Sequence, residues 1–170
     1  MLLPKLLIVG YQRHGKDFTA EYLRDRYGFK FTSSSMYAAQ KFIFDKLSGL
    51  YGYSTLEECF EDRVNHRAEW FDLICEYNKD NPSRLAESML NDGYDIYVGM
   101  RDKVELLHCK EMGLFDYIIW VDAVERLGFR EPLTSCTVDS SMADIVIDNN
   151  GSVLELYHSI DNLMKKLLQE

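Results

Sequence analysis

Residues 10–17 of the sequence read GYQRHGKD, which is the spacing of a loop that grips phosphate groups. In such a loop the two glycines, here Gly10 and Gly15, let successive backbone N–H groups point inward at an anion. The lysine, here Lys16, supplies a mobile positive charge for the outer phosphates. The usual motif continues with Ser or Thr, whose hydroxyl helps to hold Mg²⁺, but this sequence has Asp17. Because Mg²⁺ would cancel the repulsion between a carboxylate and phosphates, Asp17 is a candidate metal ligand.

The loop stands where this chemistry requires it, between a strand and a helix. Residues 5–9 (KLLIV) are a short apolar run, typical of a buried parallel strand. The stretch after Lys16 carries apolar residues at helical spacing and stops at Gly28. We therefore expect phosphates at the N-terminus of this helix, where backbone N–H groups are free. An alternative role for Asp17 is only to complement the positive end of the helix.

Strands and helices alternate along the rest of the chain. We expect strands at 29–31, 94–100, 117–123 and 143–148, and helices after the serines at 33–35, within 56–78, from Pro82 to about 92, and over 153–168. Two capping boxes are predicted, Ser54 with Glu57 and Ser152 with Glu155. The apolar stripe of the last helix is expected to pack on the core. The pattern predicts one α/β domain over residues 1–170, with a parallel sheet of about five strands covered by helices on both faces.

The composition excludes several classes of protein. With 170 residues, 46% of them hydrophobic, the chain is long enough for one core. A formal net charge of −9 argues against binding to a nucleic-acid polymer, while a local basic pocket for a small anion is still allowed. The four cysteines are scattered without a C-x-x-C pair, as expected of reduced thiols in the cytoplasm. The apolar start is interrupted by Pro4 and Lys5 and is too short to span a bilayer, so we expect no signal segment and no membrane partner.

The G-x-x-x-x-G-K-D loop resembles that of the deoxynucleoside monophosphate kinases of tailed bacteriophages, and a related loop occurs in animal-type phosphomevalonate kinases. The stretches DIYVGMRDKVEL, DYIIWVDAVER and ADIVIDNNGSVLEL are similar to later strands and helices of the phage enzymes. This resemblance implies a three-layer P-loop kinase fold, with an acceptor-binding helical region at about 33–92 and a short lid at about 123–142. It also implies ATP and Mg²⁺ as cofactors, nucleotides as small-molecule partners, and a cytoplasmic location, in the host if the protein is viral. A homodimer is one possible oligomeric state, which the sequence does not decide.

The motif and the resemblance together indicate the site residues. ATP is expected to contact the loop at Gly10, Arg13, His14, Gly15, Lys16, Asp17 and Phe18, with the His14 ring facing solvent. Arg101 stands just past a strand end, where nucleoside monophosphate kinases place an arginine that grips the acceptor phosphate. Arg126 and Arg130 lie in the stretch that resembles the lid. There they would act with Lys16 and Arg101 on the charge of the transferring phosphoryl group.

Further candidates lie on the acceptor side. Arg63 and Arg67 are four residues apart on one face of a predicted helix, so they form a candidate phosphate clamp, or else they pair with nearby acids. Ser33, Ser34 and Ser35 follow the second strand, where a substrate would lie, although capping of the next helix is the competing role. Tyr97 falls where many such kinases carry an acid. Metal positioning is therefore expected to rest on Asp17.

The function predicted on this basis is ATP-dependent transfer of a phosphoryl group to a (deoxy)nucleoside monophosphate, without a covalent enzyme intermediate. Two alternatives stay open: a P-loop kinase of another small phosphorylated metabolite, of the phosphomevalonate or dephospho-coenzyme A type, and a nucleotide-binding module without turnover. A passive binder has no need of Arg101, Arg126 and Arg130 near other strand ends. Their presence favours an enzyme.

Overall fold

Five short strands form one parallel sheet in the computed structural model of the chain, which describes residues 2–169. The strands are β1 (Leu6–Val9), β2 (Phe31–Ser33), β3 (Ile96–Val98), β4 (Tyr117–Asp122) and β5 (Ile145–Asp148). Their order across the sheet is β2-β3-β1-β4-β5, and every neighbouring pair is parallel. The central strand β1 is buried throughout, as expected for a parallel strand with helices on both faces. The predicted α/β fold is confirmed.

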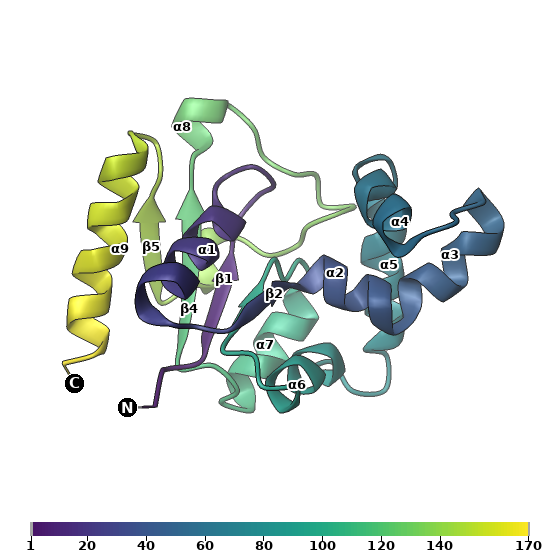
Figure 1. Cartoon of the computed structure of the whole chain (residues 1–170), viewed down its shortest axis with the longest axis horizontal. Coiled ribbons are helices and arrows are strands. Elements are labelled where there is room, and N and C mark those ends of the chain that lie inside the picture. Colours follow the sequence, from purple (N-terminus) through teal and green to yellow (C-terminus); the bar gives the residue numbers. More distant parts are fainter. Residues whose placement is uncertain (1, 170) are drawn as a thin grey trace.

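One face of the sheet is covered by two long helices, α1 (Lys16–Tyr27) and α9 (Val153–Leu167), which lie beside each other in Figure 1. Successive side chains of a strand point to opposite faces, so Leu6 and Ile8 of β1 both pack on this side. The Ser152–Glu155 capping box that starts α9 is present as predicted. Val153, assigned to the apolar stripe, is instead 52% exposed, because it lies at the start of the helix beyond the core.

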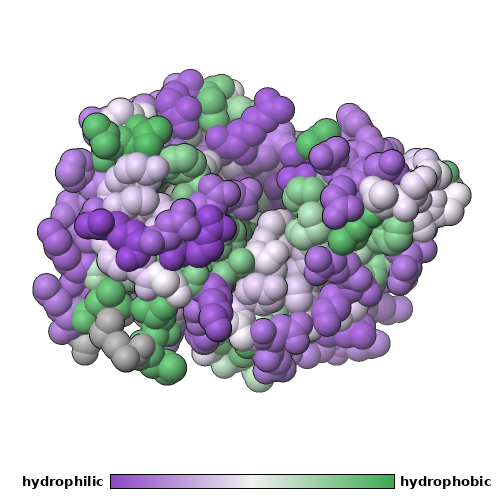
Figure 2. Space-filling view, in the orientation of Figure 1, coloured by the Kyte–Doolittle hydropathy of each residue, from purple (hydrophilic) through white to green (hydrophobic). Residues whose placement is uncertain are grey.

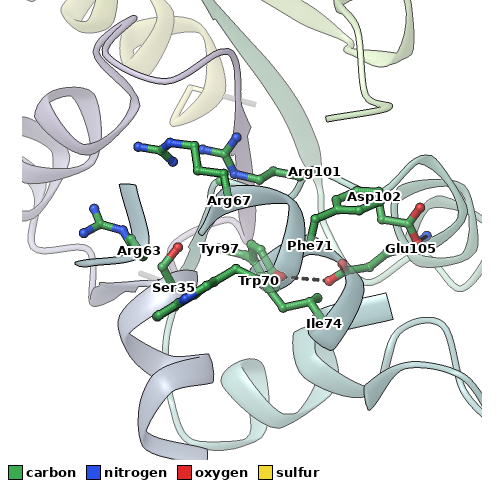
Figure 3. Close-up of a pocket in the computed structure, with 11 residues that line it drawn as sticks. Ser35, Arg63, Arg67, Trp70, Phe71, Ile74, Tyr97, Arg101, Asp102 and Glu105 are labelled. Atoms are coloured by element: carbon green, nitrogen blue, oxygen red, sulfur yellow. Dashed lines mark hydrogen bonds between the residues drawn. The ribbon is translucent and has the colours of Figure 1, made fainter. Parts of the chain in front are cut away.

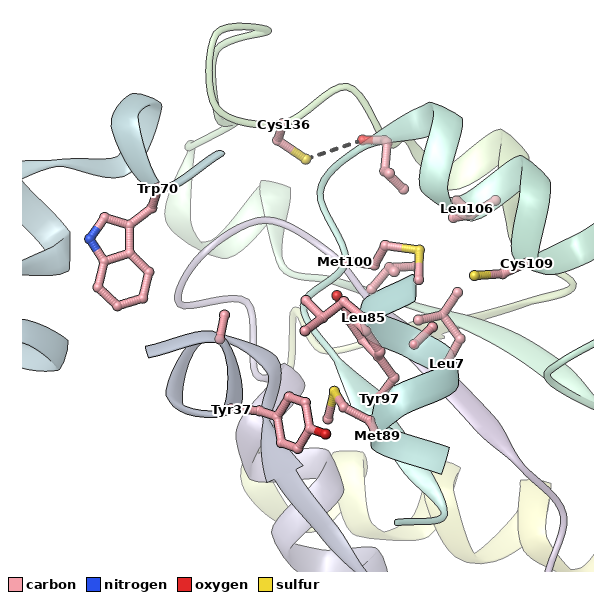
Figure 4. Packing of buried hydrophobic residues seen from close by; sticks show 14 of the residues in the cluster. Leu7, Tyr37, Trp70, Leu85, Met89, Tyr97, Met100, Leu106, Cys109 and Cys136 are labelled. Carbon is pink, nitrogen blue, oxygen red and sulfur yellow. Dashed lines mark hydrogen bonds between the residues drawn. The ribbon is translucent and has the colours of Figure 1, made fainter. Parts of the chain in front are cut away.

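The opposite face is covered by α6 (Arg84–Asn91) and α7 (Lys103–Glu111). Leu7 and Val9 of β1 point this way and pack with the apolar faces of these helices. Figure 4 shows this cluster around the ring of Tyr97. Tyr97 belongs to β3, and its side chain packs between the sheet and the helices. The two clusters together make the three layers that the resemblance implied.

Between β2 and β3 the chain forms a helical region to one side of the sheet (Figure 1). Its elements are α2 (Ser34–Ala38), a π-helical turn η1 (Ala39–Ile43), α3 (Phe44–Tyr51), α4 (Leu56–Asp62), a 3-10 turn η2 (Arg63–Asn65), α5 (Arg67–Tyr77) and α6. The helical pattern over 56–78 is broken at His66, whose backbone (φ −132°, ψ 33°) is not helical. The predicted helices are present, but the arginines on either side of His66 do not share one straight helix.

Two local predictions in this region need correction. The capping box of α4 is formed by Thr55 with Glu58, not by Ser54 with Glu57. Thr55 has an extended backbone and accepts the N–H of Glu58 at 3.2 Å, so the cap lies one residue later than predicted, while the helix begins at Leu56 as expected. The second strand is also later, at Phe31–Ser33 instead of 29–31, since its register is set by pairing with β3.

The segment between β4 and β5 corresponds to the predicted lid. It begins with a short helix, α8 (Val124–Leu127), and ends with a 3-10 turn, η3 (Ser140–Met142). Between them the chain crosses the edge of the sheet toward α4 and α5 (Figure 1). Its second half is anchored, because Cys136 and Val138 are buried in the core. We call residues 123–142 the lid segment.

The face seen in Figure 2 is largely hydrophilic, with smaller apolar areas between the charged side chains. Among residues 2–169, no helix has the length and apolar character needed to cross a membrane.

Candidate functional site

The loop after β1 has the tight curl that its sequence predicts. Gly10 (φ 150°) and Gly15 (φ 103°) both adopt conformations that favour glycine. A Cβ atom at Gly10 would lie 2.6 Å from the carbonyl oxygen of Val121, so the backbone of β4 leaves no room for a side chain. Arg13 also has a positive φ of 63°, a conformation that is strained for a residue with a side chain and that concentrates at functional sites.

His14 fixes this loop to the rest of the molecule and does not face solvent as predicted; its side chain is completely buried. Its Nδ1 accepts the N–H of Ala123 at 3.0 Å, so the ring proton is on Nε2, which donates to the carbonyl oxygen of Phe129 at 3.0 Å. The carbonyl oxygen of His14 accepts from the side-chain amide of Asn149 at 2.8 Å. Burial lowers the pKa of His14, so the ring is neutral. All three partners are more than 100 residues away, which is why sequence alone did not show them.

Lys16 is a buried cation that lacks a partner of opposite charge. Its side-chain amine donates to the carbonyl oxygen of Tyr11 at 2.9 Å, and it forms no ion pair within the described chain. Burial, together with the positive charge of Arg101, lowers the pKa of Lys16 to about 8. A buried charge is costly unless it is compensated, so this amine is suited to an anionic ligand.

Lys16 lines a hollow that we call the cationic pocket. The empty volume of this pocket is about 770 Å³, including the part that is open to solvent. Its lining consists of Gln12, Arg13, Lys16, Asp17, Ser33, Ser35, Arg63, Val64, Arg67, Val98, Gly99 and Arg101. Five of these residues are basic and one is acidic, in a chain whose net charge is −9. Such a local concentration of positive charge predicts a bound anion.

Arg63 and Arg67 both line this pocket, although they come from η2 and α5 on either side of the bend at His66. Burial lowers the pKa of Arg63, and it lowers the pKa of Arg67 to about 10 with a further contribution from Arg101. Neither arginine forms an ion pair with an acid in the described part of the chain. In Figure 3 the guanidinium groups of Arg67 and Arg101 lie next to each other. The bend at His66 brings Arg63 and Arg67 to the same pocket, where their guanidinium groups are available to a ligand.

Arg101, just after β3, pairs with a residue that the sequence did not indicate. One of its guanidinium nitrogens donates to the carboxylate of Glu131 in the lid segment. The other oxygen of Glu131 accepts the backbone N–H of Gln12 in the loop at 3.2 Å. The Glu131 side chain is 1% exposed, so the lid segment inserts a buried carboxylate between the loop and Arg101.

Arg126 and Arg130 lie elsewhere in this conformation. The guanidinium of Arg126 donates to the carbonyl oxygen of Asn149 at 3.1 Å. Arg130 lines a separate depression with Tyr11 and Asp122. Neither arginine lines the cationic pocket, so the predicted action of both on the transferring group requires movement of the lid segment and stays a prediction.

Arg126 contributes to a further hollow beside the loop, which we call the loop pocket. Its lining is Arg13, Gly15, Phe18, Arg126, Asn149, Gly151, Val153 and Leu156. Phe18 is 38% exposed and Val153 is 52% exposed, so apolar surface is open to a ligand here. A flat ring attached to the phosphates in the loop would find an apolar contact in this pocket.

The three serines at the end of β2 and the start of α2 have different roles. Ser33 caps α2 by accepting the N–H of Met36 at 3.1 Å, and it also lines the cationic pocket. Ser34 is buried and donates to the carbonyl oxygen of Val98, so the structure does not bring it into the pocket as predicted. Ser35, the next residue, lines the pocket in its place.

A second hollow, the aromatic pocket, continues from the cationic pocket and shares Ser35, Arg63, Arg67, Gly99 and Arg101 with it. Its own lining is Trp70, Phe71, Ile74, Tyr97, Asp102 and Glu105, and its empty volume is about 470 Å³ with the open part included. In Figure 3 the arginine side chains lie on one side of this pocket and the Tyr97–Glu105 contact on another. The spacing 67, 70, 71, 74 along α5 is a helical face that the sequence could have revealed.

Asp17 fits the role of a metal ligand. It is exposed in the first turn of α1 and lines the cationic pocket beside Lys16, so carboxylate oxygens face the place where phosphates would bind. Within residues 2–169, no group of three or more His, Cys, Asp or Glu side chains could hold a metal by itself. An ion at Asp17 would therefore complete its coordination with phosphate oxygens and water. Asp122, the acid at the end of β4, lines the separate depression with Arg130 and is not among the residues that line the cationic pocket.

The architecture matches solved structures over nearly the whole chain. TT1252 from Thermus thermophilus has a TM-score of 0.50 and 17% identity, covering 98% of this chain and 99% of that one. A structure described as a sugar kinase, from Janibacter sp. HTCC2649, has a TM-score of 0.50 and 13% identity, covering 99% of this chain and 95% of that one. The chain shares the three-layer α/β fold of these two structures. We call residues 10–17, which carry the G-x-x-x-x-G-K-D motif, the P-loop, and the cationic pocket lies beside it. Neither a protein-family model nor a curated protein sequence matches the chain.

Proposed function

We propose that the protein transfers the γ-phosphoryl group of ATP to the phosphate of a nucleoside monophosphate. The observation that carries this proposal is the continuity of the cationic pocket with the aromatic pocket through Arg63, Arg67 and Arg101. A molecule with a phosphate at one end and a flat ring at the other fits such a pair of pockets. One guanidinium group can bind two phosphate oxygens at once. Aromatic side chains can stack on nucleobases.

Separate groups of residues position ATP and the acceptor. The P-loop N–H groups and Lys16 hold the phosphates of ATP, with its base against Phe18 in the loop pocket. Arg67 and Arg101 hold the acceptor phosphate in line with the γ-phosphate. Mg²⁺, held by Asp17 together with phosphate oxygens, would neutralise charge on the transferring group. Positioning and positive charge supply most of the catalysis that phosphoryl transfer requires, so no covalent intermediate is needed.

The P-loop motif and the lining of the aromatic pocket both favour a particular class of acceptor. The P-loop motif resembles that of bacteriophage deoxynucleoside monophosphate kinases, which supports a deoxynucleotide as the acceptor. The substrate of a phosphomevalonate kinase carries a phosphate for the cationic pocket but has no ring to place against Trp70 and Phe71. The aromatic pocket therefore favours a nucleotide. A binding module without turnover would have no need for a second phosphate site built from three arginines.

A coupled assay of ADP release tests the proposal. All common nucleoside and deoxynucleoside monophosphates are offered with ATP and Mg²⁺, and mevalonate phosphate and dephospho-coenzyme A are included as competing acceptors. We expect turnover with at least one nucleoside monophosphate, and a loss of about 10²–10³-fold or more in Lys16→Ala. Lys166→Ala, which removes an exposed lysine of α9, is the matched control. Turnover confined to a non-nucleotide acceptor, or retained in folded Lys16→Ala, contradicts the proposal.

A further inference from the structure

Glu105 is a buried carboxyl group in the wall of the aromatic pocket, in the first turn of α7 and four residues after Arg101. Its Oε1 accepts the hydroxyl of Tyr97 at 2.8 Å, which is the dashed contact in Figure 3. Within residues 2–169, no side chain bonds to the second oxygen, Oε2. One half of this carboxyl group is therefore held by the protein, and the other half is free to meet a ligand.

The surroundings of Glu105 favour its neutral form. No basic side chain forms an ion pair with it in the described chain, and Arg101, which lines the same pocket, pairs with Glu131 instead. The titratable groups that face it are the hydroxyl of Tyr97 from β3, Asp102 at the start of α7, Cys109 within α7, and Cys75 from α5. None of these groups is a cation. Burial raises the pKa of Glu105 to about 8, and the negative charge of Asp102 adds to the effect.

A second buried polar group in the same pocket lacks a partner. Trp70 is 4% exposed, and its indole N–H has no hydrogen-bond acceptor among the described residues. A buried donor without an acceptor is costly, and it commonly marks a position that a ligand or water fills. The aromatic pocket is thus lined by a tryptophan whose buried indole N–H lacks an acceptor and by a carboxyl group with one oxygen that no side chain binds, together with the rings of Phe71 and Tyr97.

We infer that Glu105 acts as a neutral carboxylic acid that selects an acceptor whose base carries a ring nitrogen next to an exocyclic amino group, as cytosine and adenine do. This inference rests on the proposed function. The Oε2–H donates to the ring nitrogen, and Oε1 accepts one N–H of the amino group alongside the Tyr97 hydroxyl. Thymine and uracil carry an N–H and a carbonyl at these places, so their ring N–H, a donor, would face the O–H of Glu105, which is also a donor.

Guanine distinguishes this inference from recognition by a charged carboxylate. Its edge carries two N–H donors, which suit an ionised carboxylate and not a carboxylic acid. Ionisation of Glu105 would place a second negative charge beside Asp102 in a pocket of aromatic side chains. The pocket therefore disfavours guanine as long as Glu105 keeps its proton.

The test compares four deoxynucleoside monophosphates as acceptors from pH 6 to 9.5, measuring kcat/KM and, by calorimetry, equilibrium binding. In the wild-type protein we expect dCMP or dAMP to be preferred over dTMP and dGMP by at least about tenfold below pH 8. The preference should fall above pH 8 as Glu105 ionises. Lys16 also titrates near pH 8, but it acts on phosphates common to every acceptor, so its effect cancels in the ratio between acceptors.

Two variants make the readout specific. Glu105→Gln keeps a donor and an acceptor without an ionisable group, so we expect the preference to persist and to stay constant with pH. Glu105→Leu removes both groups and should reduce the preference to within about threefold of unity. Glu111→Gln, an exposed change on the same helix, is the matched control and should behave as wild type.

Each outcome separates this inference from the proposed function. Turnover of nucleoside monophosphates with a preference for dGMP or dTMP overturns the role of Glu105 and leaves the proposed function standing. A preference lost in Glu105→Gln as completely as in Glu105→Leu also overturns it, because that result requires a charged carboxylate. Absence of binding and turnover with every nucleoside monophosphate overturns the proposed function, and the inference with it.

Discussion

Arg101 and Glu131 form an ion pair that ties the end of β3 to the lid segment. The Glu131 carboxylate also accepts the backbone N–H of Gln12, so it contacts both an arginine of the proposed acceptor site and the P-loop. These are donors that a phosphate group would use. A carboxylate of the protein therefore competes with an anionic ligand for them in this conformation.

Replacement of Glu131 by Gln should release this competition. We expect Glu131→Gln to lower the KM of the acceptor by about 3–10-fold, because the incoming phosphate no longer displaces a charged group from Arg101. Binding of inorganic phosphate, measured by calorimetry, should tighten in the same direction. Weaker binding in Glu131→Gln would show that the carboxylate orients Arg101 and does not compete with the ligand. Exchange of the exposed Glu125 for Gln in the same segment is a suitable control.

Arg101 itself can be tested by a change that keeps its charge. Arg101→Lys loses the planar fork that binds two phosphate oxygens, so the KM of the acceptor should rise by about tenfold or more while the KM of ATP changes little. Steady-state kinetics with each substrate varied in turn measures both constants. A defect confined to the KM of ATP would move Arg101 to the ATP side of the site. Arg24→Lys, on the exposed face of α1, serves as the control.

Asp17 should reveal its role through the dependence on Mg²⁺. If its carboxylate holds the ion, Asp17→Asn raises the Mg²⁺ concentration that gives half the maximal rate, and Asp17→Ser recovers part of the loss by restoring the commoner ligand. If Asp17 only complements the helix end, both variants lose about 0.3–1 kcal/mol of stability and keep the wild-type Mg²⁺ dependence. Titration of Mg²⁺ at fixed ATP, with thermal melts of all three proteins, decides between the two roles.

His14 should make the stability of the fold depend on pH. Its folded-state pKa lies below the ordinary value of 6.5, so the unfolded chain binds more protons in the window between the two values. The free energy of unfolding therefore falls as the pH drops below about 6.5, by at most about 1.4 kcal/mol per pH unit for one proton. Chemical unfolding from pH 5 to 7.5 measures this slope. We expect a shallower slope in His14→Gln, and an unchanged slope in His158→Gln, which alters an exposed histidine of α9.

The strands of the sheet and the P-loop can be predicted from the sequence, because both depend on residues that are neighbours in the chain. The apolar runs that became β1, β3, β4 and β5 could be recognised from the sequence, as could the glycine positions and Lys16 of the loop. Helix caps depend on a few adjacent residues, so the Ser152–Glu155 box was correct. The box at Thr55 was missed by one residue, because several polar residues there could each serve as the cap.

The surroundings of these elements depend on contacts between residues that are far apart in the chain. His14 was expected in solvent, yet partners 109, 115 and 135 residues away bury its loop. The pairing of Glu131 with Arg101 and the contact of Glu105 with Tyr97 arise where the packed chain brings separate elements to one edge of the sheet. Whether a carboxyl group there is charged depends on burial and on the charges around it. Burial is a property of the packed chain as a whole, so no local stretch of sequence specifies it.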